Sequence, residues 1–253
     1  MPATSTNHPI GIPFIEINSV ESTNNYAMQL IQQGLATHGT VCFAHTQTAG
    51  KGQRGKGWYA KAGENITMSV VFNTNTLQVA EQFGLSMVIA LGAYDFFRFY
   101  TAGDTFVKWP NDLYWRDRKA GGILIENILR GKEWQWAVAG IGININQTVF
   151  DIKTKSPVSL KQITGKEYGP VVLAKELCEH VDYWYNQLMN KGTTFLLEAY
   201  NTVLYKRGQH IKLKKNSAVF ECFLKGVNAY GQLVVEGALE QNFNVGEVEW
   251  IIS

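Results

Sequence analysis

The apolar pattern of the chain changes character at Lys206, and this change limits what the chain can fold into. Before Lys206, β-branched and aromatic runs alternate with long stretches of helical periodicity. After it, helical periodicity ends and only short β-type runs separated by turn residues remain. We therefore expect an α/β (α+β) domain, a mixed sheet backed by helices, over residues 1–205 and a small β-barrel over residues 206–253.

Local patterns place the expected elements. In the first domain, strands are predicted at 12–17, 40–46, 65–73, 106–109, 113–115, 122–129 and 133–146, with a polar turn at 116–118. Helices are predicted from an N-cap at Ser22 to Gly34 and at 78–100, 159–163, 171–189 and 195–204. In the second domain, strands are predicted at 210–213, 218–227, 232–236 and 247–252, with turns at 215–216, 228–231 and Asn242.

Composition excludes several classes of protein. The chain has 253 residues, 45% of them hydrophobic and 17% charged, so it can bury a core and is not disordered in bulk. A net charge of +2 is too small to argue for nucleic-acid binding. The three cysteines form no C-x-x-C, which favours buried free thiols in a reducing compartment. Residues 1–14 resemble no secretory signal and no apolar run reaches ~20 residues, so we expect a cytoplasmic protein without membrane contact.

The segment from Gln47 to Gly63 carries five glycines and four basic residues but no acid. Glycines let backbone N–H groups approach an anion, and the cations supply charge, so a phosphate or carboxylate is the expected guest. The segment fits the dinucleotide fingerprint and the phosphate loop of nucleotide hydrolases only in part. No helix follows, and Gly57 stands where the phosphate loop needs Ser or Thr. A mobile surface loop is the remaining alternative from this segment alone.

The same segment resembles the Gly-Arg-Gly-Arg-x-Gly-Arg-x-Trp loop of biotin protein ligases, and other motifs of that family follow in the family's order. They are Ser22-Thr23-Asn24, Lys108-Trp109-Pro110-Asn111-Asp112, Lys119-Ala120-Gly121-Gly122-Ile123-Leu124-Ile125-Glu126 and Gly140-Ile141-Gly142-Ile143-Asn144. The Pro-Asn-Asp block with the following lysine is the most specific of them. The β-type tail is similar to the family's SH3-like C-terminal domain, so the resemblance covers nearly the whole chain.

The resemblance implies a two-step reaction. Biotin's carboxylate attacks the α-phosphate of ATP, giving biotinyl-AMP and pyrophosphate. A lysine ε-amine on a biotin carboxyl carrier domain of a carboxylase then attacks the mixed anhydride. Magnesium is implied as the counter-ion of the ATP phosphates, with no protein ligand named.

Site residues carry over residue by residue. Lys119 is expected to bridge the biotin carboxylate and the α-phosphate, with Lys51 sharing the carboxylate. Asp112 is expected to accept a proton from, or to orient, the carrier lysine. The expected biotin-binding residues are Ser22, Thr23, Asn24, Gln47, Gly50, Lys51, Lys119 and Gly122. The expected nucleotide-binding residues are Lys56, Trp58, Asn111, Lys119 and Asn144, with Trp58 offering a flat face to adenine.

The chain departs from the family pattern in its loop and at its start. Family arginines appear as Lys51, Gln53 and Lys56, so the bidentate fork is lost and, at Gln53, the charge as well. With Ser22 already in a motif of the ligase domain, we expect no helix-turn-helix domain and no DNA partner; a homodimer is left open. The alternatives are a lipoate–protein ligase and a non-catalytic adaptor that grips an anion or a nucleic acid, which would bind in a salt-dependent manner without ATP turnover.

Overall fold

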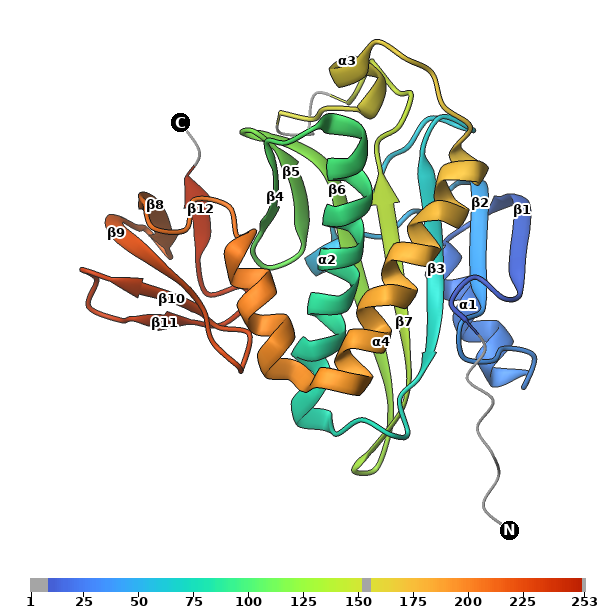
Figure 1. The fold of residues 1–253 in the computed structure, drawn as a ribbon, viewed down its shortest axis with the longest axis horizontal. Helices are drawn as coiled ribbons and strands as arrows, with labels where there is room; N and C mark the ends of the chain where they lie inside the picture. The colour runs from blue at the N-terminus through green and yellow to red at the C-terminus, as the bar shows by residue number, and fades with distance from the viewer. Residues whose placement is uncertain (1–8, 152–155, 252–253) are drawn as a thin grey trace.

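The first part of the chain is built on a mixed sheet of seven strands in the order β1-β2-β3-β7-β6-β5-β4 (Figure 1). The structure, a computed structural model, describes residues 9–151 and 156–251. β1 and β2 pair in parallel, and every other neighbouring pair is antiparallel. The strands are β1 (Phe14–Val20), β2 (Val41–Gln47), β3 (Ile66–Asn73), β4 (Thr105–Lys108), β5 (Asp112–Trp115), β6 (Arg118–Arg130) and β7 (Glu133–Ile143). The expected mixed sheet is confirmed.

Helices cover both faces of this sheet (Figure 1). α1 (Thr23–Gln32) covers one face, and α2 (Gln82–Thr101) and α4 (Pro170–Thr202) cover the other. The described chain also contains α3 (Leu160–Thr164) and the 3-10 turns η1 (Gln53–Gly55) and η2 (Val79–Glu81). Alternation along the strands sorts the core, because successive side chains point to opposite faces. Val41 and Phe43 pack with the residues of α2 and α4, whereas Cys42 packs with Ala27 of α1.

The C-terminal part is a five-stranded antiparallel sheet in the order β11-β10-β9-β8-β12. Its strands are β8 (His210–Lys215), β9 (Ala218–Val227), β10 (Leu233–Glu236), β11 (Asn242–Phe243) and β12 (Glu249–Ile251). The prediction of a turn at Asn242 was wrong, since this residue pairs with Val234 in β11. A two-residue strand is too short to leave a periodic signal.

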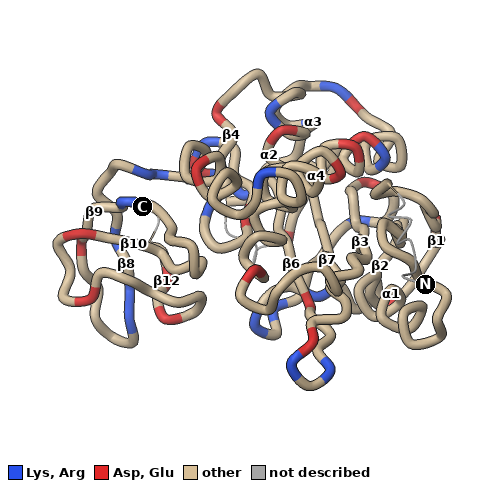
Figure 2. The backbone as a smooth tube through the Cα atoms, turned by 60° about the horizontal axis from the view of Figure 1, so that its bottom comes forward, with Lys and Arg blue, Asp and Glu red and all other residues tan. Residues whose placement is uncertain are grey.

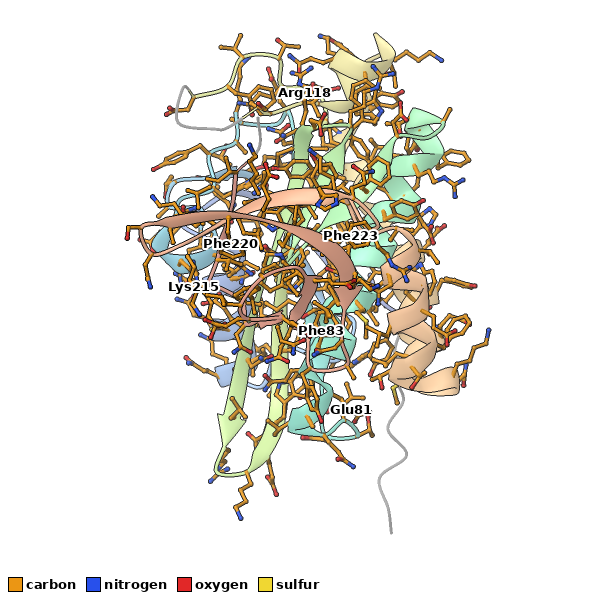
Figure 3. The ribbon with its side chains drawn as sticks, turned by 90° about the vertical axis from the view of Figure 1, so that its left-hand side faces the viewer. Glu81, Phe83, Arg118, Lys215, Phe220 and Phe223 are labelled. Atoms are coloured by element: carbon orange, nitrogen blue, oxygen red, sulfur yellow. The ribbon has the colours of Figure 1, made fainter. Side chains whose placement is uncertain are left out.

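The two parts of the chain are joined by specific contacts. The Trp109 Nε1–H donates to the carbonyl of Gly231 at 2.8 Å, and the Asn201 side chain exchanges two hydrogen bonds with the backbone of Val227. Phe83, at the start of α2, lies against Gly231 beside the C-terminal sheet (Figure 3). One hydrophobic core runs through residues of both sheets. The division of the chain at residues 205 and 206 stays a prediction.

Three local expectations change. The helices predicted at 171–189 and 195–204 form the single element α4, which bends at Gly192, where φ is 77°. Ser22 occupies the N-cap position of α1, but its side chain makes no capping hydrogen bond. The turn predicted at 116–118 is shorter, because Arg118 already begins β6. The ends of the chain, including most of residues 1–14 and the last residue of the strand predicted at 247–252, lie outside the described residues.

Lysine and arginine alternate with aspartate and glutamate over both parts of the molecule (Figure 2). This mixture agrees with the small net charge. Within the described residues, no helix is both long and apolar enough to cross a membrane. All three cysteines are free and buried, as expected. Burial raises the pKa of the Cys42 thiol to about 12 and that of Cys178 to about 12.

Candidate active site

Three glycines leave the centre of the sheet without side chains on the face that α1 covers. Gly122 of β6 lies opposite Gly142 of β7, and Gly140 follows on the same face. A methyl group at Gly140 would lie 2.5 Å from Oδ1 of Asn24, and one at Gly142 would lie 2.4 Å from Cε2 of Trp58. We call these three residues the glycine floor. At Gly140 and Gly142 the missing side chain lets Asn24 and Trp58 pack directly on the backbone of β7.

The glycine-rich segment forms a small hairpin over this floor. Trp58 N–H donates to the Gly50 carbonyl at 2.8 Å, Gly52 N–H donates to the Lys56 carbonyl at 2.7 Å, and Lys51 bridges Gly57. Apart from this one bridge and the 3-10 turn η1, the segment between β2 and β3 has no regular secondary structure. Glycine is needed at position 50, where a side chain would lie 2.4 Å from the Trp58 carbonyl.

A pocket of about 560 Å³ lies between this hairpin and β6. Its lining consists of residues 47–52 and 54–59 with Leu124 and Glu126. Its volume falls in the range of small-molecule sites, ~300–1,000 Å³. The hairpin contributes cations and backbone N–H groups to its wall, so the pocket suits an anionic ligand.

Several of the side chains expected to bind biotin meet at the start of α1. Ser22, Thr23 and Asn24 are all buried. Oε1 of Gln47 accepts from the Thr23 N–H at 2.8 Å and lies 3.1 Å from its hydroxyl oxygen. Oγ of Ser69, on β3, lies 2.7 Å from Oγ1 of Thr23 and 2.6 Å from Oδ1 of Asn24. Thr23, Asn24, Gln47 and Ser69 thus form one connected polar cluster, which we call the head-group cluster.

Lys119 and Asp112 form the second centre of the site. Nζ of Lys119 donates to Oδ1 of Asp112 at 2.6 Å, and both side chains are partly buried. Gly122 stands opposite Asp112 in the register, and a methyl group there would lie 3.4 Å from the Lys119 ammonium. The strand carrying Lys119 is further fixed by backbone bonds to Ser156 and Val158. A rigid strand thus presents a cation beside a carboxylate.

Lys51 is placed apart from this pair. Its ammonium donates to Oδ1 of Asn25 at 2.6 Å and lies 3.8 Å from Oε1 of Glu126. Glu126 also accepts from Nδ2 of Asn24 at 2.7 Å. The structure therefore joins Lys51 to the head-group cluster rather than to Lys119.

The predicted nucleotide residues divide into two kinds. Lys56 and Trp58 line the pocket, and the indole Nε1 of Trp58 is buried with no hydrogen-bond partner. The Asn111 amide donates to the Ile123 carbonyl, and the Asn144 amide donates to the Val158 carbonyl at 3.1 Å. The asparagine side chains therefore fix backbone around Lys119.

A buried tyrosine lies under the Pro-Asn-Asp block. The Tyr200 hydroxyl donates to the Pro110 carbonyl at 3.4 Å. Burial, and second the charge of Asp112, raise the pKa of Tyr200 well above its usual range. Tyr200 thus stays a neutral donor beneath the site. Across the described part of the chain, no cluster of three or more His, Cys, Asp or Glu is arranged to hold a metal ion.

Sequence reasoning gave no role to three residues of the site: Asn25, Ser69 and Glu126. Two of them leave a signal, because Ser69 interrupts the apolar run of β3 and Glu126 is the one charge between Ile123 and Leu129. Both stand on the face of the glycine floor. Asn25 leaves no such signal, since a polar residue in the first turn of a helix is ordinary.

Comparison with known proteins gives one family. The sequence profile described as the biotin/lipoate A/B protein ligase family matches residues 16–144, just over half of the chain. The chain is 37% identical over 150 residues to the bifunctional ligase/repressor BirA of Escherichia coli, which covers 59% of this chain and 45% of that protein. The chain thus spans about half the length of the first curated relatives it matches.

A shorter relative and a solved structure cover more of the chain. The biotin–[acetyl-CoA-carboxylase] ligase of Paracoccus denitrificans is 29% identical over 223 residues, 86% of this chain and 91% of that one. The structure of the Aquifex aeolicus biotin protein ligase in complex with biotin and ATP superposes with a TM-score of 0.79 at 23% identity, covering 95% of this chain and 99% of that one. This superposition shows that both parts of the chain share that fold.

Proposed function

We propose, since the chain belongs to the biotin/lipoate A/B protein ligase family, that it uses ATP to attach biotin to a lysine of a carboxyl carrier domain. The observation that carries the proposal is the pocket between the hairpin and β6. Gln47 of the Thr23–Gln47 contact lines it, and the Lys119–Asp112 pair stands beside Gly122 of the glycine floor. Relatives named as ligases of acetyl-CoA carboxylase support it.

In the first step, an oxygen of the biotin carboxylate attacks the α-phosphorus and pyrophosphate leaves. Both reactants are anions, so the chain must neutralise charge and hold the reacting atoms together. Lys119 suits this because its ammonium is fixed by a strand and by Asp112 at 2.6 Å. Lys51 would turn from Asn25 to the carboxylate, and Lys56 would face the phosphates.

Magnesium enters as part of the ATP substrate, held by phosphate oxygens and water. The two carboxylates described in the site do not suit a metal ion. Asp112 faces the ammonium of Lys119, and Glu126 faces Lys51 and the Asn24 amide. Neither chemical step draws on a protein-bound metal.

In the second step, the ε-amine of the carrier lysine attacks the acyl carbon and AMP leaves. The amine must first lose a proton, and Asp112 is the carboxylate beside the reacting centre that would accept it. Oδ1 of Asp112 accepts a hydrogen bond from the Lys119 ammonium. The hairpin closing over the pocket would keep water from the anhydride.

At the two ends of the ligand, the chain would bind by contacts of different kinds. Ser22, Thr23 and Gln47 would face the ureido ring of biotin, and the unused capping hydroxyl of Ser22 fits such a role. Trp58 would stack on adenine. Asn111 and Asn144 would act on the nucleotide through the backbone they hold in place.

The test is mass spectrometry of the protein mixed with biotin, ATP and Mg²⁺. We expect biotinyl-AMP with the wild type and a loss of about 10²–10³-fold in its rate of formation with Lys119→Ala, the size of effect for removing one group that stabilises developing charge. Lys132→Ala, at the exposed turn between β6 and β7, is the matched control. Lipoate is tested in parallel: lipoyl-AMP instead of biotinyl-AMP would make the chain a lipoate ligase, and neither product from folded protein would refute the proposal.

A further inference from the structure

Two polar side chains that line the pocket, Gln47 and Glu126, are joined behind its wall by buried hydrogen bonds. The connection runs through Asn24, Ser69 and Thr23, whose exposed fractions are 3%, 0% and 3%. We call these five residues the relay. These three side chains are almost wholly buried, so each of their donors must meet an acceptor in the protein; besides its partner in the relay, Nδ2 of Asn24 faces the Leu124 carbonyl at 3.4 Å.

The Glu126 end fixes the first two directions. Nδ2 of Asn24 lies 2.7 Å from the carboxylate of Glu126, which only accepts, so Oδ1 of Asn24 faces Ser69. An amide oxygen carries no proton, and therefore the Ser69 hydroxyl donates at the 2.6 Å contact. The opposite assignment would hold two lone pairs together at that distance.

A hydroxyl has one proton, and this decides the next direction. Because Ser69 donates to Asn24, its oxygen must accept at the 2.7 Å contact with Oγ1 of Thr23. The proton of Thr23 thus points to Ser69 rather than to Oε1 of Gln47, which is farther away at 3.1 Å and already accepts the Thr23 backbone N–H. The free lone pair of the Thr23 hydroxyl is an acceptor.

The Gln47 end has the opposite polarity. Since Oε1 takes the backbone N–H of Thr23 at 2.8 Å, Nε2 is turned away from Thr23. It lies beneath the glycine-rich hairpin, 3.1 Å from where a methyl group on Gly50 would stand. The two ends of the head-group site thus present an acceptor at Thr23 and a donor at Gln47.

We propose that Ser69 is a positioning residue that holds the Thr23 hydroxyl as an acceptor and thereby selects a ligand with an N–H at that point. The inference rests on the proposed function, in which Thr23 contacts the biotin ring. A cyclic urea, which carries N–H donors beside a carbonyl acceptor, matches the polarity of both residues. A cyclic carbamate, with ring oxygen in place of N–H, would meet the lone pair of Thr23 with another lone pair.

The test compares the dissociation constants of biotin and of its two ring-oxygen analogues, each with one ureido N–H replaced by oxygen, by calorimetry on the full chain. We expect the wild type to bind biotin more tightly than at least one analogue. Ser69→Ala should raise the dissociation constant of biotin about tenfold. It should also reduce the ratio of the dissociation constants of analogue and biotin about tenfold, because the freed Thr23 proton can then be donated to a ring oxygen. Thr67→Val is the control, since its buried hydroxyl on β3 bonds to Ala44 outside the relay.

The outcomes separate the two proposals. A wild type that binds no biotin refutes the proposed function. A wild type that binds biotin and both analogues equally, or a Ser69→Ala variant that keeps the full preference, overturns the inference about Ser69. If Ser69→Ala does not fold, Ser69→Cys fills the same space with a weak donor and should also narrow the preference. A structural defect alone would weaken all three ligands by the same factor.

Discussion

Two glycines of the floor, Gly140 and Gly142, should control the two ends of the pocket independently. Each tolerates no side chain: the added methyl group would lie 2.5 Å from Asn24 in one case and 2.4 Å from Trp58 in the other. Ordinary contacts start near 3.4 Å, so the neighbour must withdraw by about 1 Å. Gly140→Ala therefore disturbs the head-group cluster, and Gly142→Ala displaces the proposed adenine platform.

The magnitude follows from the cost of overpacking. Inserting a methyl group into a well-packed site costs about 1–3 kcal/mol. If that strain falls on the ligand-binding conformation, each variant should lose about 5- to 150-fold in affinity for its own ligand. Gly140→Ala should raise the dissociation constant of biotin and spare the KM for ATP, whereas Gly142→Ala should do the reverse.

The assay pairs calorimetry with biotin and pyrophosphate release against ATP concentration at saturating biotin. Thermal unfolding of both variants shows whether they fold. The two glycines are two residues apart on one strand, so each variant serves as the other's control for general damage to β7. Equal losses for both ligands in both variants, or a biotin defect confined to Gly142→Ala, would refute the assignment of the two ends.

Three further predictions follow from other contacts. Asp112→Asn should leave the rate of biotinyl-AMP formation within about tenfold of wild type but slow transfer of biotin to the carrier by about 10²-fold, because a general base is lost. Single-turnover transfer from isolated biotinyl-AMP measures the second step. Equal slowing of both steps would contradict this role of Asp112. The free energy of unfolding should fall as pH rises from 9 toward 12, because the thiols of Cys42 and Cys178 release protons in the unfolded state and retain them in the native state. Urea titrations at pH 8 and 10.5 measure this fall. It should be smaller in a Cys42→Ala/Cys178→Ala variant. Asn201→Ala should lower the free energy of unfolding by about 1–3 kcal/mol, because it leaves backbone groups of Val227 in β9 unpaired. An unchanged midpoint in urea would argue against this contact between α4 and β9.

Much of the fold was predictable because apolar runs, helical periodicity and turn residues indicate strands, helices and turns locally. The apolar run of β3 and the turn before Lys119 were visible in the sequence, and the antiparallel pairing of β5 with β6 brings Asp112 close to Lys119. The contact of Trp58 with Gly142 was not predictable, because no local pattern links a hairpin to a strand more than 80 residues away. Ser22 occupies the N-cap position that the sequence predicts, but its side chain makes no capping hydrogen bond.

The relay shows a second limit. Ser69 reads in the sequence as one polar residue inside an apolar strand, and its meaning depends on which strand lies beside it. Its partner in the register is Gly140, whose missing side chain lets Asn24 reach Ser69. The resemblance in the motifs predicts which residues act in the proposed reaction, whereas the direction of the hydrogen bonds required the assembled sheet.

The central place of β7 bears on how the chain is made. β7 lies between β3 and β6, so the sheet is in two unconnected halves until Ile143 has left the ribosome. At ~5–20 residues per second, synthesis from the end of β3 to the end of β7 takes several seconds. Throughout that time β3 has a bare edge and is open to pairing with other nascent chains. Slower translation between Asn73 and Ile143 should therefore lower the soluble yield, while slower translation after Ile143 should not.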